Sequence, residues 1–318
     1  MAVTLHKQAN CGFVMLNNPP VNAINQKMRE GLIDAVTWAE SEGLERVILS
    51  GMGRSFAAGA DTKEFDQPAI SPHLPDVVNR IETSTVPWIA AIHGTALGGG
   101  GELALGCRYR IARADATIGF PEVILGLVPG AGATQRLPRL VGLAEALKLI
   151  PTGKTISGKA AMTIGLVNAI DDDPVAAAKL IDQKILSEAV PLSLMKAGTD
   201  KTVNYDTARQ IAIRRMRGQE APLTAISLLK TAQTATFDDG MQKERNAFLA
   251  LRASSQARAL RHIFFAERAA KKPPKAIETQ KSKLKPLNHV IVIGGGTMGS
   301  SIAYAFLNAN IRVTILES

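Results

Sequence analysis

The stretch IHGTALGGGGELALGCRYRIA, residues 92–112, decides the fold of this chain. The apolar run from Trp88 to His93 leads into it and predicts a buried strand. The glycines 98–101 then open an apolar, helix-forming run, and a short strand is expected from Tyr109 to Ala112. A strand, a helix and a second strand in this order indicate an α/β architecture.

The same alternation continues on both sides of this stretch. Strands are expected from Phe13 to Leu16 and from Val47 to Ser50, and the segment between them carries apolar residues at helical spacing. Further on, a strand is expected from Ile164 to Ile170, followed by an alanine-rich helix from Pro174 to about Leu186. We therefore expect one α/β core over residues 1–190.

Strand signals end after this core. Between Leu192 and Ala270, apolar residues recur at helical spacing, as in the runs Ala208 to Met216, Leu223 to Thr231 and Met241 to Leu251. Residues 191–270 are therefore expected to form a helical C-terminal part of the same unit. Residues 271–288 combine three prolines with six lysines and predict a solvated linker.

The last thirty residues have the pattern of one βαβ unit. A strand is expected from His289 to Ile293, a helix from Thr297 to Ala309 and a strand from Ile311 to Leu316. Thirty residues are too few to bury the core of a complete dinucleotide-binding domain. We expect residues 289–318 to be the first βαβ of a truncated NAD-binding domain.

Composition excludes several classes of protein. Apolar residues make up 46% of the 318 and charged residues 20%, which is typical of a globular protein. The two cysteines, Cys11 and Cys107, and five scattered histidines predict neither a disulfide framework nor a metal site. No apolar run approaches the ~18 residues that span a bilayer.

Neither end of the chain has a recognisable targeting signal. The opening MAVTLHKQAN lacks the features of a secretory signal, and the closing ILES is not a peroxisomal SKL-type signal. A cytoplasmic enzyme is therefore expected if the protein is bacterial.

The net charge of +9 is unevenly distributed. Residues 1–190 carry 17 basic and 19 acidic side chains, whereas residues 191–318 carry 20 and 9. The basic residues have no interleaved aromatic residues of the kind that stack on bases. We expect no nucleic-acid partner; a solvated face, the lysine linker or attraction for an anionic phosphorylated substrate explains the charge better.

Two segments of small residues predict an anion site. Backbone N–H groups at the helix start in 98–101 are unpaired and point along the positive end of the helix dipole. The segment GRSFAAGAD, residues 53–61, also allows close approach to the main chain. Together they could form an oxyanion hole. Each segment alone fits equally well with tight packing or turns.

Two glutamates lie next to these segments. Glu102 falls in the first helical turn after the glycines, and Glu122 lies among apolar residues in GFPEVILGLVPG, residues 119–130. A pair of carboxylates is what acid/base catalysis needs, because burial can separate their pKa values. Singly, each glutamate is better explained as structural.

Four motifs in order resemble those of the enoyl-CoA hydratase/isomerase, or crotonase, superfamily. They are NNPPVNAI (17–24), SFAAGADTKEF (55–65), residues 92–112 as quoted above, and GFPEVILGLVPGAGATQRLPRLVG (119–142). The resemblance covers about residues 1–270 and implies a spiral of ββα turns, a bound acyl-CoA thioester, and neither a metal nor a cofactor. With the linker and the glycine turn, the chain resembles the N-terminal part of multifunctional β-oxidation enzymes, in which a hydratase/isomerase precedes a 3-hydroxyacyl-CoA dehydrogenase.

The resemblance also implies roles for individual residues. The amides of Ala60 and Gly99 would hold the thioester oxygen as it becomes enolate-like. Glu102 would orient and activate water for attack at Cβ, and Glu122 would deliver or remove the Cα proton. The stretch Ala60, Asp61, Thr62, Lys63 would lie along the CoA moiety. Gly101 departs from the pattern, because a larger residue is common there, and a looser helix start is expected.

The segment GGGTMG, residues 294–299, has the spacing of a dinucleotide fingerprint. The glycines are Gly294, Gly296 and Gly299, Met298 lies inside the motif, and the acid about twenty residues on is Glu317. This is half of a site, so we expect NAD binding and dehydrogenase activity only in a longer parent protein. The chain would then be a truncated gene product, a cloned segment or a piece of a longer enzyme.

The predicted function is enoyl-CoA hydration in fatty-acid β-oxidation, in which a trans-2-enoyl-CoA and water give a 3-hydroxyacyl-CoA. Δ3-Δ2 isomerisation through Glu122 is left open, as is the formation of oligomers. The alternative is a non-catalytic acyl-CoA-binding or assembly module with a crotonase fold. A nicotinamide oxidoreductase is a third interpretation, and it rests on the last thirty residues alone.

Overall fold

The computed structural model describes residues 2–65, 67–198, 203–270 and 286–317. The chain divides into two compact units, Met1–Phe264 and Phe265–Ser318, and each is described by itself. The predicted linker over 271–288 lies outside the described residues except for its last three. Across the described ranges, no helix combines the length and the apolar character needed to cross a membrane.

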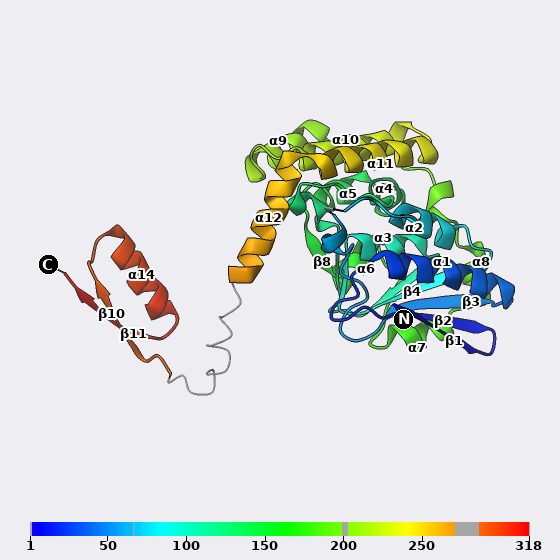
Figure 1. Cartoon of the computed structure of the whole chain (residues 1–318), viewed down its shortest axis with the longest axis horizontal. Coiled ribbons are helices and arrows are strands. Elements are labelled where there is room, and N and C mark those ends of the chain that lie inside the picture. Colours follow the sequence, from blue (N-terminus) through cyan, green and yellow to red (C-terminus); the bar gives the residue numbers. More distant parts are fainter. Residues whose placement is uncertain (1, 66, 199–202, 271–285, 318) are drawn as a thin grey trace. The chain divides into compact units, whose positions relative to one another are not determined.

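The first unit is built on a six-stranded sheet with the strand order β1-β2-β3-β4-β6-β9 (Figure 1). The strands β1 and β2 form an antiparallel hairpin, and every later pairing is parallel. The strands are β1 Val3–Gln8, β2 Cys11–Leu16, β3 Arg46–Gly51, β4 Trp88–Ile92, β6 Tyr109–Ala112 and β9 Ala169–Ile170.

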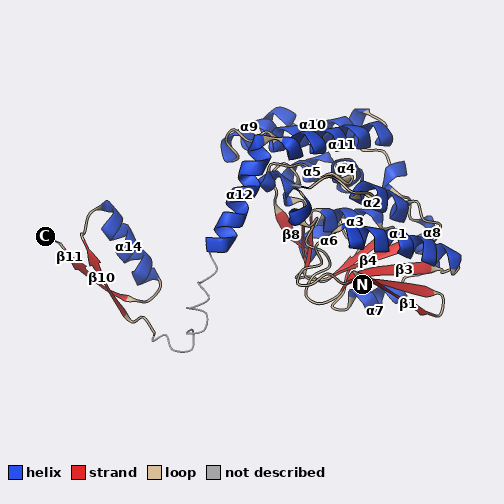
Figure 2. Cartoon of the chain, in the orientation of Figure 1, coloured by secondary structure: helices blue, strands red, loops and turns tan. Residues whose placement is uncertain are grey.

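Both faces of this sheet are covered, as continuous apolar strands require. Val47 and Leu49 of β3 belong to the main core, whereas Ile48 between them packs into a second cluster with Ala178 and Leu186. Helices α1 Gln26–Ser41, α2 Leu74–Glu82 and α3 Gly99–Gly106 lie on the first face, and α7 Pro174–Lys179 lies on the second (Figure 2). Helix α8 Gln183–Glu188 contributes Leu186 to the second cluster.

A small second sheet brings the glycine-rich segments together. It consists of β5 Thr95–Leu97, β7 Thr117–Gly119 and β8 Thr155–Ser157, in the order β5-β7-β8. On its other side, β5 meets the segment around Ala57 through an isolated bridge between Ala57 and Ala96. The residues that follow Ala57 and those that follow β5 therefore end side by side.

Helices cover the remaining side of the first unit. The runs predicted in the region 208–251 are confirmed as α9, α10 and α11, and α10 packs against α4. Side-chain caps fix the N-termini of α9 and α11. The Asn204 side chain accepts a hydrogen bond from Thr207 N, and the Thr236 side chain accepts one from Asp239 N. The elements are η1 Thr62–Glu64, η2 Pro121–Leu125, α4 Ala133–Val141, α5 Leu143–Leu149, α6 Gly158–Thr163, η3 Leu192–Leu194, α9 Tyr205–Arg215, α10 Ala221–Thr234, α11 Phe237–Ala253 and α12 Ser255–Ala270.

Two sequence predictions in the first unit need correction. Of the strand expected from Ile164 to Ile170, only Ala169–Ile170 is extended, because the chain leaves α6 through a turn at Gly165, where φ is +79°. The helix expected from Pro174 to Leu186 is two helices, since Asp182 caps a new start by accepting from Lys184 N.

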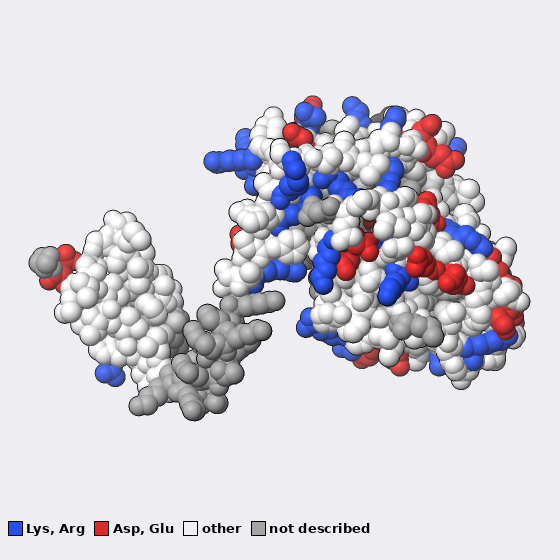
Figure 3. All heavy atoms as spheres, viewed as in Figure 1, with Lys and Arg blue, Asp and Glu red and all other residues white. Residues whose placement is uncertain are grey.

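The second unit has the predicted βαβ order. Strand β10 His289–Ile293 pairs in parallel with β11 Arg312–Leu316, and α14 Thr297–Asn308 connects them. Many apolar side chains of this unit stay exposed, among them Ile293 at 85% and Met298 at 78%. The face visible in Figure 3 is mostly uncharged, so this unit presents apolar surface that it does not bury itself.

Candidate active site

Two backbone segments lie against each other at the start of α3. A Cβ placed on Gly99 would lie 3.5 Å from the amide nitrogen of Ala60, and one placed on Gly59 would lie 3.8 Å from the amide nitrogen of Gly99. Within the described residues, neither the Ala60 nor the Gly99 amide has a hydrogen-bond acceptor. The two amides that were predicted to act together therefore lie near each other and are free to bind an oxygen.

Glycine is required at this junction for conformational reasons. Gly59 has a φ of +97° and Gly98 a φ of +52°, values that residues with a Cβ rarely adopt. The Gly98 amide donates to Gly119 O at 2.8 Å, which anchors the turn to β7. This turn leaves the Gly99 amide at the first position of α3, where a helix has no acceptor for it.

The segment expected to lie along CoA leads away from this junction. Asp61 caps η1 by accepting from Lys63 N at 3.0 Å, Thr62 is half-buried, and the Lys63 side chain is exposed. Arg252 of α11 donates to the carbonyl oxygens of Glu64 and Phe65 and holds the end of this segment to the helical layer. Asp61 and Lys63 are thus fixed at the surface beside the Ala60 amide.

Glu102 is buried at the first turn of α3, with 3% of its surface exposed. Its Oε1 accepts hydrogen bonds from Ala131 N at 2.7 Å and Ala133 N at 3.1 Å. Burial raises the pKa of the Glu102 carboxyl, while the two amides and the nearby Arg136 guanidinium oppose that rise. One carboxylate oxygen is therefore held by the protein and the other is left for a ligand.

Glu122 reaches the same place from η2. A Cβ placed on Gly98 would lie 2.8 Å from Glu122 Oε1. The Oε2 atom is sealed from solvent and finds no hydrogen-bond partner in the part of the chain that the structure describes. Burial, together with the Glu102 charge, raises the pKa of Glu122 well above its ordinary range. A buried, unpartnered carboxyl oxygen costs free energy unless a ligand or water satisfies it.

A third buried carboxylate, Glu244 of α11, was not predicted from the sequence. It is 1% exposed and accepts from Gly132 N at 2.6 Å, from Thr134 N at 2.9 Å and from Thr134 Oγ1 at 2.5 Å. Burial and the Glu102 charge raise the pKa of Glu244 to about 8. One signal was available, because Glu244 lies in the apolar stripe that Met241, Phe248 and Leu251 continue along the helix.

The space left by Gly101 is filled. A Cβ on Gly101 would lie 2.9 Å from the ring of Phe120, which is fully buried. The Phe120 ring therefore occupies the space that a larger side chain at position 101 would need.

The second glycine turn has the geometry of a phosphate-binding turn. Gly294 has a φ of +94°, and a Cβ on Gly299 would lie 1.8 Å from Gly294 O, so α14 packs closely against β10. Around Gly296 there is no atom within 4 Å of a placed Cβ in the described part of the chain. Glu317 accepts a hydrogen bond from Gly295 N, and Met298 is exposed. These residues fit one half of a dinucleotide site.

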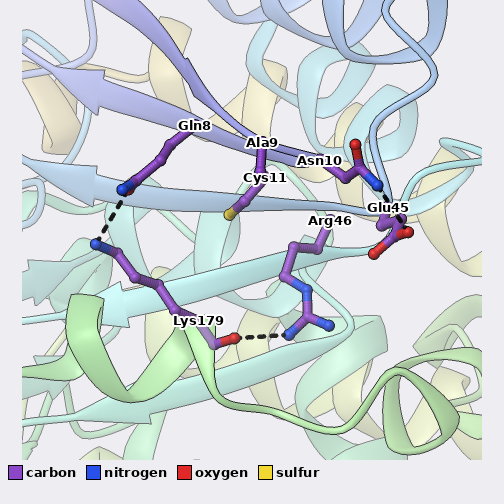
Figure 4. Close-up of a pocket in the computed structure, with 7 residues that line it drawn as sticks. All are labelled: Gln8, Ala9, Asn10, Cys11, Glu45, Arg46 and Lys179. Atoms are coloured by element: carbon purple, nitrogen blue, oxygen red, sulfur yellow. Dashed lines mark hydrogen bonds between the residues drawn. The ribbon is translucent and has the colours of Figure 1, made fainter.

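A surface hollow at the β1–β2 turn is a different feature (Figure 4). Its polar groups bond to one another, since Lys179 Nζ donates to Gln8 Oε1 at 3.4 Å and Asn10 Nδ2 to Glu45 Oε1 at 3.0 Å. It contains none of the residues predicted to bind substrate. As for metals, the described residues hold no group of three or more His, Cys, Asp or Glu side chains that could bind an ion.

The buried site can support acid/base chemistry beside a developing oxyanion. Two free amides, an anchored carboxylate and a carboxyl of raised pKa, whose Oε2 atom has no partner among the described residues, converge on the start of α3. Such a group of residues can hold an enolate, take a proton from water and give one to carbon.

Comparison with known families gives two matches. The family described as "Enoyl-CoA hydratase/isomerase" matches residues 6–248. The family described as "3-hydroxyacyl-CoA dehydrogenase, NAD binding domain" matches residues 289–318.

Individual relatives agree with these matches. A "Peroxisomal bifunctional enzyme" from Cavia porcellus is 38% identical over 330 residues, covering 100% of this chain and 46% of that protein. A "Fatty acid oxidation complex subunit alpha" from Shewanella baltica is 35% identical and covers 87% of this chain and 41% of that protein. The solved structure of an enoyl-CoA hydratase from Thermoplasma volcanium is 31% identical, with a TM-score of 0.54, and the match covers 76% of this chain and 97% of that one. The chain spans less than half the length of the first two relatives.

Proposed function

The chain belongs to the enoyl-CoA hydratase/isomerase family, whose members are enzymes of the crotonase type, and on this premise we propose that Glu102 and Glu122 catalyse the addition of water to a trans-2-enoyl-CoA. The product is a 3-hydroxyacyl-CoA, and the reaction belongs to fatty-acid β-oxidation. The observation that carries the proposal is the convergence of Glu102, Glu122 and the free amides of Ala60 and Gly99 on one buried place.

The environments of the two glutamates support different roles for them. Glu102 accepts two backbone N–H bonds and lies near Arg136, and both favour its charged form relative to Glu122. Glu122 is removed from solvent, has no donor at Oε2 among the described residues and lies beside the Glu102 charge, which together raise its pKa and favour its protonated form. Glu102 is then the base and Glu122 the acid.

The reaction proceeds in balanced steps. Glu102 Oε2 takes a proton from a water molecule as the water oxygen bonds to Cβ, and the electron pair of the Cα–Cβ double bond moves toward the thioester. The thioester oxygen becomes enolate-like and is held by the Ala60 and Gly99 amides. Glu122 then gives its proton to Cα, which restores the thioester carbonyl. After product release, proton exchange with solvent returns Glu102 to its charged form and Glu122 to its protonated form.

Isomerisation is a second activity that one observation favours. The Glu122 Oε2 atom is buried and unpartnered among the described residues, so it can remove as well as deliver a proton on the acyl chain. The same amides would stabilise the dienolate formed when a Δ3-enoyl-CoA loses a Cα proton.

The CoA moiety would leave the site along the stretch Ala60, Asp61, Thr62 and Lys63. The exposed Lys63 ammonium can attract a CoA phosphate as a point charge. Basic side chains gather over α9 and the adjoining helices (Figure 3), which gives the molecule a further basic region. The absence of a nucleic-acid partner stays a prediction.

NAD belongs to a longer parent protein in this proposal. Gly294, Gly296, Met298 and Gly299 would hold its pyrophosphate at the start of α14, and Glu317 would bind its adenosine ribose. When bound, NAD would supply a nicotinamide ring that accepts hydride. The relatives named above include a peroxisomal and a bacterial enzyme, so a cytoplasmic location stays a prediction for a bacterial source. Oligomer formation is likewise left open.

The test is hydration of crotonyl-CoA by the purified chain, followed by loss of the absorbance of the conjugated thioester. We expect turnover that saturates with substrate. A folded sample that binds the CoA ester tightly without hydrating or isomerising it would instead identify a non-catalytic acyl-CoA-binding or assembly module.

A further inference from the structure

The turn whose amides bind Glu102 is also hydrogen-bonded to a second carboxylate, on its opposite side. Residues 131–134 lead into α4, and their amides alternate between two carboxylates. Ala131 N and Ala133 N donate to Glu102, whereas Gly132 N and Thr134 N donate to Glu244.

We propose that Glu244 is a positioning residue for Glu102, because it fixes the turn whose amides orient the Glu102 carboxylate. Gly132 has a φ of +107°, which directs successive amides to opposite sides of the chain. The Thr134 hydroxyl adds a third hydrogen bond to Glu244 Oε2, at 2.5 Å. The expected effect of Glu244 on the reaction rate rests on the proposed function. Its expected effect on the pKa of Glu102 does not.

The surroundings leave the turn few alternative positions. The Arg136 guanidinium donates to Ala131 O at 3.1 Å and pairs with the buried Glu82 carboxylate at 2.7 Å. A Cβ on Gly132 would lie 1.9 Å from Arg136 Nη1. Arg136 contacts the turn on one side. On the other side, Glu244 of α11 accepts its hydrogen bonds.

Burying the Glu244 carboxylate costs free energy unless hydrogen bonds from the turn compensate for its lost hydration. Glu244 is almost fully buried in an otherwise apolar stripe of α11, and an apolar residue there would pack without desolvating a polar group. Its three donors all come from Gly132 and Thr134. The position therefore needs an acceptor for this turn.

The sharpest variant loosens the turn and leaves all three carboxylates in place. Thr134→Val removes one of the three hydrogen bonds to Glu244 with little change in volume, whereas Thr134→Ser keeps the hydroxyl. The groups that bear on the charge of Glu102 are Glu122 on η2, Arg136 on α4 and Glu244 on α11, and Arg245 lies near Glu244. None of these residues is substituted in either variant, although the loss of the Thr134 hydroxyl removes a hydrogen bond that lowers the pKa of Glu244.

Two readouts test the proposal. Carbon-13 NMR of the glutamate side-chain carboxyl carbons, assigned with Glu102→Gln, follows the titration of Glu102 in the full chain. Weaker amide bonds to the charged form should raise the pKa of Glu102 by at least ~0.5 in Thr134→Val and leave it unchanged in Thr134→Ser. Crotonyl-CoA kinetics should show a kcat lowered roughly 10-fold in Thr134→Val with KM within about 2-fold, since misplacing a catalytic group costs rate.

The controls separate positioning from general damage. Ser50→Ala deletes another buried hydrogen bond, from Ser50 Oγ to Ala91 O at 2.8 Å in the sheet, and should change neither the titration of Glu102 nor kcat. An unchanged Glu102 titration in a folded Thr134→Val protein overturns the proposal. If the parent chain fails to hydrate crotonyl-CoA, the proposed function fails, and the NMR titration still decides whether Glu244 and Thr134 position Glu102.

Discussion

Glycines 98–101 and the glycines at 294–296 and 299 both lie where a strand is followed by a helix, but their surroundings differ. All four glycines of the first set are buried, and a Cβ on Gly100 would lie 2.2 Å from Ala57 O. In the second set, placed Cβ atoms on Gly294 and Gly296 have no neighbour within 4 Å among the described residues.

The difference lies in what the rest of the chain adds. At the first turn, three other segments approach, namely residues 57–60, η2 with Glu122, and the 131–134 turn held by α11. Around the second turn, the elements that the described residues form are β10, β11 and α14. A glycine turn before a helix thus becomes a site only when distant segments enclose it.

The largest effect should come from the carboxylates that enclose the first turn. Glu102→Gln and Glu122→Gln should each lower kcat at least ~10²-fold, which is typical of one positioned acid or base. Crotonyl-CoA hydration measures this, with Glu145→Gln as a control on an exposed ion pair with Lys148. Near-normal hydration by either buried variant would remove that glutamate from its role.

Adding one methyl group tests the enclosure directly. Gly100→Ala would place its Cβ against the Ala57 carbonyl and should lower the free energy of unfolding by about 1–3 kcal/mol. Gly296→Ala, with open space around it, should change it by less than about 0.5 kcal/mol. Urea unfolding of both variants gives the comparison, and equal effects would contradict it.

Buried Glu244 should make stability depend on pH. Its pKa rises from an ordinary 4.5 to about 8 in the fold, so the stability it contributes is present below about 4.5 and is lost as pH rises through about 8. Relative to the parent, Glu244→Gln should therefore become more stable as pH increases, by at most ~1.4 kcal/mol per pH unit. Urea unfolding at pH 5, 7 and 9 tests the sign, and a constant difference would be inconsistent with it.

The smallest effect is expected for NADH binding at the second glycine turn, residues 294–299. A dinucleotide site lies across two βαβ halves of a sheet, and the second unit has one. Calorimetric titration with NADH should therefore give no saturable binding, either to the full chain or to a chain ending at Lys272. Micromolar binding that disappears in the shorter chain would show this expectation to be wrong.

Local patterns predicted most of the elements because burial dictates them. The strands Trp88–Ile92 and Tyr109–Ala112 and helices α10 and α11 follow from apolar runs and spacing. The β1 strand was missed, since five of its six residues are exposed and it has no apolar alternation. The residues 164–168 look like a strand by composition, but the turn at Gly165 prevents one.

The site was predicted where glycines and acids adjoin in the sequence, and missed where the fold joins distant residues. Glu102 and Glu122 lie in recognisable motifs, whereas Glu244 lies in no motif and is marked only by its place in the apolar stripe of α11. Only tertiary structure shows that its neighbours are Gly132 and Thr134. Similarly, no local pattern reveals that the Phe120 ring occupies the space beside Gly101.

The hydrogen bonds from Gly132 and Thr134 to Glu244 join residues 112 and 110 positions apart, and this has a consequence for the order of synthesis. A ribosome completes every recognisable motif of the site by residue 142, and at ~5–20 residues per second it reaches Glu244 several seconds later. During that interval the nascent chain carries Glu102 and Glu122, the proposed catalytic pair, but lacks the group that we propose to fix the base. A polypeptide released before α11 should therefore match the family by its motifs and still lack an ordered catalytic centre.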